Sequence, residues 1–132
     1  MSSEQQAVLK TNEAFYRAFS NNDIVSMEKL WSTQVDITII HPGWAPLQGR
    51  ESVMSSWNQI MTGASSSPIT CVNARVNVLG DVALVICTEI LEEIELIATN
   101  TFVLESGEWK LIHHQAGPLP QSNNIHEGDI LH

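Results

Sequence analysis

The sequence has few basic residues, few cysteines and no long apolar run. Six Lys and Arg stand against fifteen Asp and Glu, and the net charge of -9 opposes binding to nucleic-acid phosphates. Every apolar run is far shorter than the roughly 20 residues that cross a bilayer. The N-terminal stretch MSSEQQAVLK has neither a signal core nor an Arg-rich presequence. We therefore expect a cytoplasmic protein that binds neither nucleic acid nor membrane.

The scarcity of cysteine bears on cofactors and metals. Cys71 and Cys87 form no CxxC pair and no zinc spacing, and we expect both to be reduced and buried. His41, His113 and Glu89 would match a two-histidine, one-carboxylate metal set in composition, but they lie far apart in the sequence. We therefore expect no cofactor and no resident metal.

The chain of 132 residues suffices for one domain with one core. Apolar residues recur at helical spacing in the first half, and after Pro68 the period changes to two, which is typical of strands. We expect a domain over residues 1–120 and a tail, 121–132, that is loosely ordered or packed on a partner subunit. Helices are expected at 4–19, 24–31 and 50–61, and strands at 35–40, 69–79, 82–92, 94–105 and 108–116.

Turn residues set the expected register of the last four strands. Two-residue turns are expected at Gly80-Asp81 and Ser106-Gly107, and a third turn, unmarked by Gly or Pro, near Glu93-Ile94. In this register one face of the sheet is apolar except at one end, where four polar residues gather. These are Glu89, Asn100, His113 and Gln115. The same register places the two thiols on opposite faces, where they cannot form a disulfide.

The polar end of the apolar face needs partners, because burying such a group unpaired costs about 1 to 3 kcal/mol. A ligand pocket meets this need and is the preferred hypothesis. A closed network whose members satisfy one another meets it equally well.

The opposite face of the predicted sheet is also unusual. It is too apolar to be left in water, which predicts a homodimer packed through it unless the tail covers it. Its apolar residues are Leu84, Ile86, Ile90 and Ile112.

Three segments carry a resemblance that extends over residues 4–120. AFYRAFSNNDIVSMEKLW, IIHPGWAPLQGRESV and ATNTFVLESGEWKLIHHQAGP, with the spacing between them, resemble the SnoaL-like branch of the nuclear-transport-factor-2-like superfamily. The resemblance implies an α+β fold, a cone-shaped half-barrel in which a curved, mainly antiparallel sheet wraps around an N-terminal helix hairpin and a third helix. It also implies a pocket at the wide end and dimerisation through the sheet.

Members of this superfamily include ketosteroid isomerases, polyketide cyclases, dehydratases, epoxide hydrolases, a kinase association domain and noncatalytic carriers. The fold therefore does not select a function. Ketosteroid isomerases need an aspartate base, and no Asp falls on the expected inner strand positions, so steroid isomerisation is not expected.

Two histidines and one carboxylate are the candidate catalytic groups. His113 and His41 titrate near neutrality, and Glu89 would orient a histidine or raise its pKa. The alternative for His113 is a purely structural hydrogen bond. Asn100 and Gln115 are expected to place a small apolar or cyclic ligand. Aromatic side chains would line the pocket, although two of them would serve equally well as core. They are Tyr16, Trp31, Trp44 and Trp57, and Trp31 and Trp57 are the two with the core alternative.

These residues suit a cofactor-independent acid–base enzyme of isomerase, lyase or hydrolase type. The alternatives are a noncatalytic ligand carrier and a domain that associates with another protein.

Overall fold

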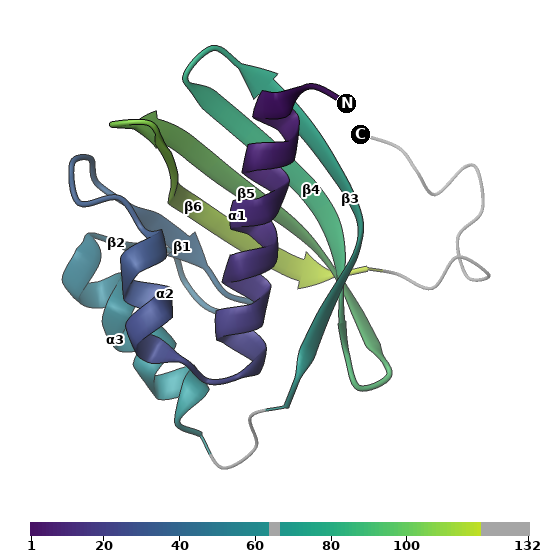
Figure 1. The fold of residues 1–132 in the computed structure, drawn as a ribbon. Helices are drawn as coiled ribbons and strands as arrows, with labels where there is room; N and C mark the ends of the chain where they lie inside the picture. The colour runs from purple at the N-terminus through teal and green to yellow at the C-terminus, as the bar shows by residue number, and fades with distance from the viewer. Residues whose placement is uncertain (64–66, 120–132) are drawn as a thin grey trace.

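The structure is a computed structural model, and it describes residues 1–63 and 67–119. The expected tail at 121–132 lies outside the described residues. Within the described residues, three helices accompany one six-stranded sheet of order β2-β1-β6-β5-β4-β3 (Figure 1). The helices are α1 (Ser3–Ser20), α2 (Ile24–Leu30) and α3 (Arg50–Met61), and the strands are β1 (Thr38–Ile40), β2 (Leu47–Gln48), β3 (Ile69–Leu79), β4 (Val82–Leu91), β5 (Ile94–Glu105) and β6 (Glu108–Pro118).

Helix α1 lies across the concave face of the curved sheet, and α2 and α3 lie beside it near β1 and β2 (Figure 1). Strand β1 runs parallel to β6, and all other neighbouring strands are antiparallel. This is the α+β half-barrel that the sequence predicts. No helix of the described residues is both long and apolar enough to cross a membrane.

Helix α1 begins where its N-terminal amides find side-chain partners. Ser2 and Gln5 form a capping box, in which each side chain accepts from the backbone N–H of the other. Apolar residues at three- and four-residue spacing then turn one side of the helix toward the sheet. The same side carries two polar residues, Asn12 and Tyr16, which are also buried.

The hairpin turns agree with the sequence at two of three positions. Leu79 pairs with Val82 and Glu105 pairs with Glu108, which confirms the turns at Gly80-Asp81 and Ser106-Gly107. The third turn was predicted one residue too late, because it is formed by Glu92 and Glu93. Glu92 takes a φ of 57°, a conformation that Gly or Asn adopts more readily, so no residue type marks this turn in the sequence.

A bulge in β6 overturns part of the predicted register. Thr101 pairs with His113 but the next residue of β5, Phe102, pairs with Leu111, so Ile112 is an extra residue in β6. One inserted residue exchanges the two faces of everything beyond it. The prediction that His113 and Gln115 face inward is therefore wrong, and the inward residue is His114, which is 1% exposed.

A second bulge, in β3, has the same effect on the cysteines. The register shifts between Val72 and Arg75, and Asn73 has a φ of 56°. Cys71 therefore lies opposite Glu89, turns toward α1 and accepts a hydrogen bond from Asn12 Nδ2 at 3.6 Å. The prediction that the thiols lie on opposite faces is wrong, because the Cys87 thiol donates a hydrogen bond to Cys71.

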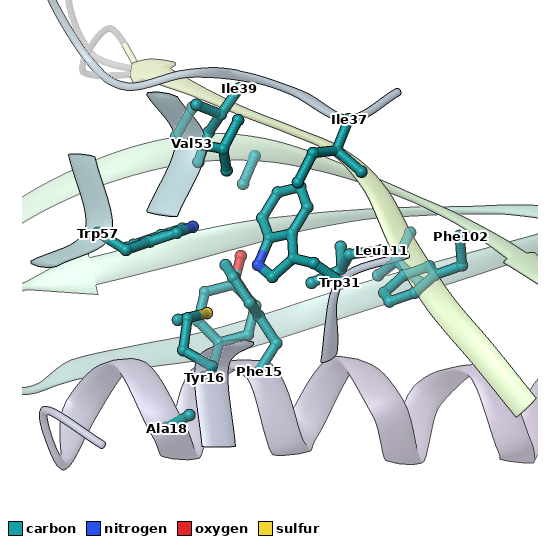
Figure 2. Close-up of a cluster of buried hydrophobic side chains, with 14 of the residues drawn as sticks. Phe15, Tyr16, Ala18, Trp31, Ile37, Ile39, Val53, Trp57, Phe102 and Leu111 are labelled. Atoms are coloured by element: carbon teal, nitrogen blue, oxygen red, sulfur yellow. The ribbon is translucent and has the colours of Figure 1, made fainter. Parts of the chain in front are cut away.

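The core fills the space between α1, α3 and the concave face of the sheet. Its centre is aromatic, and the ring of Phe15 packs edge-on against those of Tyr16 and Trp57, with centroids at 4.8 and 5.5 Å. Trp31 and Trp57 are 1% and 0% exposed and lie side by side with centroids 6.5 Å apart (Figure 2).

Candidate functional site

A buried polar network lies on the inner face, between α1 and the sheet. Two members stand one helical turn apart on α1, and the other three come from β4, β5 and β6. Each is at most 5% exposed, so the fold has taken five polar side chains almost entirely out of water. We call these five residues the inner network. They are Asn12, Tyr16, Glu89, Asn100 and His114.

The hydrogen bonds of the inner network have defined donors and acceptors. The Tyr16 hydroxyl donates to Glu89 Oε2 at 2.6 Å. Asn100 Nδ2 donates to the Tyr16 oxygen at 3.1 Å and to Asn12 Oδ1 at 2.9 Å. Because Asn100 uses its amide nitrogen on this side, its Oδ1 accepts a hydrogen bond from His114 Nδ1 on the other.

This arrangement fixes the role of His114. Its Nδ1 carries the proton, so its Nε2 presents a lone pair to Glu89 Oε2 at 3.8 Å. Burial, with a smaller contribution from the neighbouring His41 and His113, lowers the pKa of His114 to about 3. His114 is therefore a neutral imidazole at physiological pH, and it forms no ion pair with Glu89.

Glu89 is the group in the network whose proton is most easily moved near neutrality. Burial raises the pKa of its carboxyl to about 7, although the hydrogen bond from Tyr16 opposes this shift. Burial also raises the pKa of Tyr16, so the phenol stays protonated. Glu89 therefore exists in comparable amounts as acid and as carboxylate at neutral pH and is able to give or take a proton.

His41, a predicted catalytic residue, is buried near the inner network but bonds elsewhere. Its Nε2 lies 2.9 Å from Ser56 Oγ, and Ser56 donates its own proton to Val53 O at 2.7 Å. His41 is therefore the donor in this pair. Burial lowers the pKa of His41 to about 4. Its ring lies 4.9 Å from those of Trp44 and Trp57.

Two predicted site residues lie on the other face of the sheet. His113 Nδ1 bonds Thr38 Oγ1 at 2.6 Å, and its Nε2 lies 3.3 Å from Gln115 Oε1. The structure thus separates His113 from Glu89 and His41, and the three do not form the metal set considered from the sequence. Among residues 1–63 and 67–119, no group of three or more His, Cys, Asp or Glu side chains is placed to hold a metal.

Sequence reasoning missed two members of the inner network. Asn12 carries a usable signal, because it occupies a position on the apolar side of α1 where a polar residue needs a partner. His114 carries none, since only the bulge at Ile112 turns it inward.

The two buried tryptophans are not fully satisfied. Within the part of the chain that the structure describes, the indole N–H groups of Trp31 and Trp57 have no hydrogen-bond partner. Leaving a buried donor unpaired costs about 1 to 3 kcal/mol. Tryptophan N–H groups in protein interiors usually find an acceptor. All five members of the inner network have hydrogen-bond partners within the network, so among the buried side chains of the described residues only these two indole N–H groups lack one.

Access from solvent is limited. A surface cavity of about 270 Å³ is lined by residues that include Phe19, Trp44 and Leu91, but by no member of the inner network. Phe19, which lines this cavity, packs its ring edge-on against Trp57, with centroids 4.8 Å apart. Trp44 is 36% exposed at the cavity, so it lies at the surface while Trp31 and Trp57 lie in the core.

Helices packed into a curved, mainly antiparallel sheet, with polar groups gathered on the inner face, define the nuclear-transport-factor-2-like class of α+β half-barrels. The sequence model of the SnoaL-like domain matches residues 8–120. The chain therefore belongs to the SnoaL-like domain family, as its sequence segments predict.

Several solved structures of the same class are similar to this chain in sequence or fold. A proposed dehydratase of the NTF2-like family from Streptomyces avermitilis is 30% identical, with a TM-score of 0.82 over 90% of this chain and 98% of that one. A proposed calcium/calmodulin-dependent protein kinase type II association domain from Thiobacillus denitrificans is 27% identical. Its TM-score is 0.75 over 83% of this chain and 93% of that one. A proposed ketosteroid isomerase from Parabacteroides distasonis, 14% identical, has a TM-score of 0.67 over 85% of each chain and shares the fold. No curated protein matches the chain.

Proposed function

We propose that this chain is a cofactor-independent acid–base enzyme of isomerase, lyase or hydrolase type, in which Glu89 transfers the proton. The observation that carries the proposal is a carboxyl group that is 2% exposed, accepts a 2.6 Å hydrogen bond from Tyr16 and has a pKa of about 7. A general acid or base works best when its pKa lies near the working pH.

The pKa values and the position of His113 favour Glu89 over a histidine in this role. His114 and His41 have pKa values of about 3 and 4, so near neutrality they are weak bases and lack the imidazolium form that would act as an acid. His113 lies on the other face of the sheet. In the proposed site Tyr16 donates to Glu89 and stabilises its carboxylate form, while Asn100 and His114 hold that pair in position.

The ligand in this proposal is a small apolar or cyclic molecule that reaches the inner face from the cavity beside Trp44. Phe19 lines that cavity and packs against Trp57, so in this proposal its ring turns aside for the ligand to pass. The relation to a proposed dehydratase at 30% identity supports a lyase over the other two reaction types. Two free thiols suit a reducing compartment, which supports the cytoplasm as the place of action.

The test is a broad reaction screen in deuterated buffer. Cyclic ketones, hydroxy ketones, epoxides and esters are incubated with the protein, and proton NMR follows deuterium uptake and new products. We expect turnover of at least one class, and a fall of about 100-fold or more in Glu89→Gln. Glu93→Gln, in the exposed β4–β5 turn, is the matched control and should keep full activity. Turnover that survives unchanged in Glu89→Gln refutes the proposal, as does a failure to convert any compound.

The outer face of the sheet supports a second proposal, that two copies of this chain associate. Ile86 on β4 is 47% exposed and Ile97 on β5 is 40% exposed, while Leu84, Ile90 and Ile112 on the same face are half-buried. Apolar side chains gathered on one sheet face favour a protein partner. The relation to a proposed association domain at 27% identity agrees with this proposal.

A further inference from the structure

The two thiols of the chain lie next to each other on the inner face, and the chemistry proposed for Glu89 does not use them. Cys71 on β3 stands directly opposite Glu89, and Cys87 lies two residues before Glu89 on β4. The register shift in β3 places Asn73 and Ala74 together opposite Cys87. The two cysteines are therefore diagonal neighbours across one pair of strands.

Contacts with α1 place the thiols side by side on independent grounds. Asn12 Nδ2 donates to Cys71 Sγ at 3.6 Å, and the Tyr16 hydroxyl lies 3.3 Å from Cys87 Sγ. Asn12 and Tyr16 are four residues apart, so their side chains are neighbours on one side of the helix. The Cys87 thiol in turn donates a hydrogen bond to Cys71. The fold therefore holds the two sulfur atoms in contact.

The two thiols differ in access and in acidity. Cys71 is half-buried, whereas Cys87 is 1% exposed. The hydrogen bonds from Cys87 and Asn12 lower the pKa of Cys71, and donating the bond, together with burial, raises the pKa of Cys87. An accessible, acidic thiol beside a second thiol is the arrangement in which an oxidant reacts with the first and the second then resolves it.

We propose that Cys71 and Cys87 are a modification site for hydroperoxides, at which they form a reversible disulfide. Diagonal neighbours in a regular ladder have Cα atoms about 7–8 Å apart, at the limit for a disulfide. The bulge at Asn73 interrupts the ladder opposite Cys87, so β3 can move toward β4 there with little loss of pairing. This modification site does not depend on the function proposed for Glu89.

The reaction consumes one hydroperoxide and two thiols. The Cys71 thiolate attacks a peroxide oxygen, the O–O bond breaks, and the sulfur becomes a sulfenic acid while the other oxygen takes up a proton and leaves as water or alcohol. The Cys87 sulfur then loses its proton and attacks the Cys71 sulfur, so the S–O bond breaks and a water molecule leaves. A small thiol reductant restores both thiols by exchange.

The first experiment uses the unaltered chain. Trypsin cleaves after Arg50, Arg75 and Lys110, which puts the cysteines in separate peptides, 51–75 and 76–110. After treatment with hydrogen peroxide at pH 7 we expect a single chain that has lost about 2 Da, with these two peptides linked. Dithiothreitol should reverse the change, whereas it leaves oxidised methionine as it is. Two thiols that stay free, a Cys71 sulfinic acid beside a free Cys87, or links only between chains overturn the proposal.

The second experiment tests the order of the two steps. In Cys87→Ala we expect Cys71 to stop at the sulfenic acid, which dimedone traps. In the matched variant Cys71→Ala, the Cys87 thiol should be lost at least about 10-fold more slowly, because it is buried and less acidic. Equal rates in the two variants, or no dimedone adduct in Cys87→Ala, overturn the assignment of Cys71 as the attacking thiol.

The third experiment asks whether the disulfide reaches the inner network. Forming the bond removes the Cys87 proton and draws its sulfur toward β3, next to the Tyr16 hydroxyl. Tyr16 is the one tyrosine of the chain, so its ring gives a single set of NMR signals. We expect these signals to shift on oxidation and to return with dithiothreitol. Unmoved signals in a chain that carries the disulfide overturn the placement of Cys87 against Tyr16.

Discussion

The hydrogen bond between the two cysteines of the inner face shifts their pKa values in opposite directions. A hydrogen bond from the Cys87 thiol lowers the pKa of Cys71, outweighing its partial burial, and Asn12 lowers it further. Donating that bond, together with burial, raises the pKa of Cys87. Two thiols on adjacent strands therefore differ in how readily each becomes a thiolate, the reactive form.

This difference predicts an order of reaction. In the folded protein we expect iodoacetamide to alkylate Cys71 at least about 10-fold faster than Cys87, because Cys71 is half-buried with a lowered pKa and Cys87 is buried. Peptide mass spectrometry of timed samples gives both rates. The unfolded protein is the control and should show similar rates. Faster labelling of Cys87 in the folded protein would contradict the described environment of the thiols.

At the scale of elements, periodicity and turn residues account for most of what could be predicted. Helix α1 and strands β3, β4 and β5 lie within one residue of their expected bounds, since apolar spacing and the Gly-containing turns specify them. The short β2 was missed, and β1 is shorter than expected, because a three-residue strand held by parallel pairing with distant β6 has little local signal. Such pairing depends on tertiary context.

The two bulges explain why the candidate site was only partly predicted. Glu89 and Asn100 lie on stretches of β4 and β5 whose faces the turns specify, and both are in the inner network as expected. His114 and Cys71 lie beyond Ile112 and Asn73, where one extra residue exchanges the faces. Asn tolerates the left-handed conformation found at Asn73, but nothing in the sequence distinguishes it from any other Asn in a strand.

At the scale of the whole molecule, the outer sheet face bears on assembly. We expect light scattering with size exclusion to give twice the chain mass of 14.6 kDa, and Ile86→Glu to reduce it to a single chain by placing a charge in an apolar contact. Val25→Glu is the matched control, because Val25 is 57% exposed on α2, away from the sheet. A monomer before any substitution, or a dimer that persists in Ile86→Glu, would contradict association through this face.

The titration of Glu89 also affects the stability of the whole molecule. Its folded-state pKa is raised from 4.5 to about 7, so the protonated form contributes stability that is fully present below pH 4.5 and is lost as pH rises through 7. Glu89→Gln imitates the protonated form at every pH. Above pH 7 the free energy of unfolding of the unaltered protein should fall relative to that of this variant by an amount that approaches about 3 kcal/mol.

The most direct measurement of the central claim is a pH titration of the Glu89 side-chain carboxyl by ¹³C NMR, with Glu89→Gln used to assign the signal. The account predicts a midpoint of about pH 7, well separated from the exposed glutamates. A midpoint near the ordinary value of 4.5 would mean that Glu89 is a fully ionised structural group at neutral pH. That result would remove the basis for assigning proton transfer to this residue.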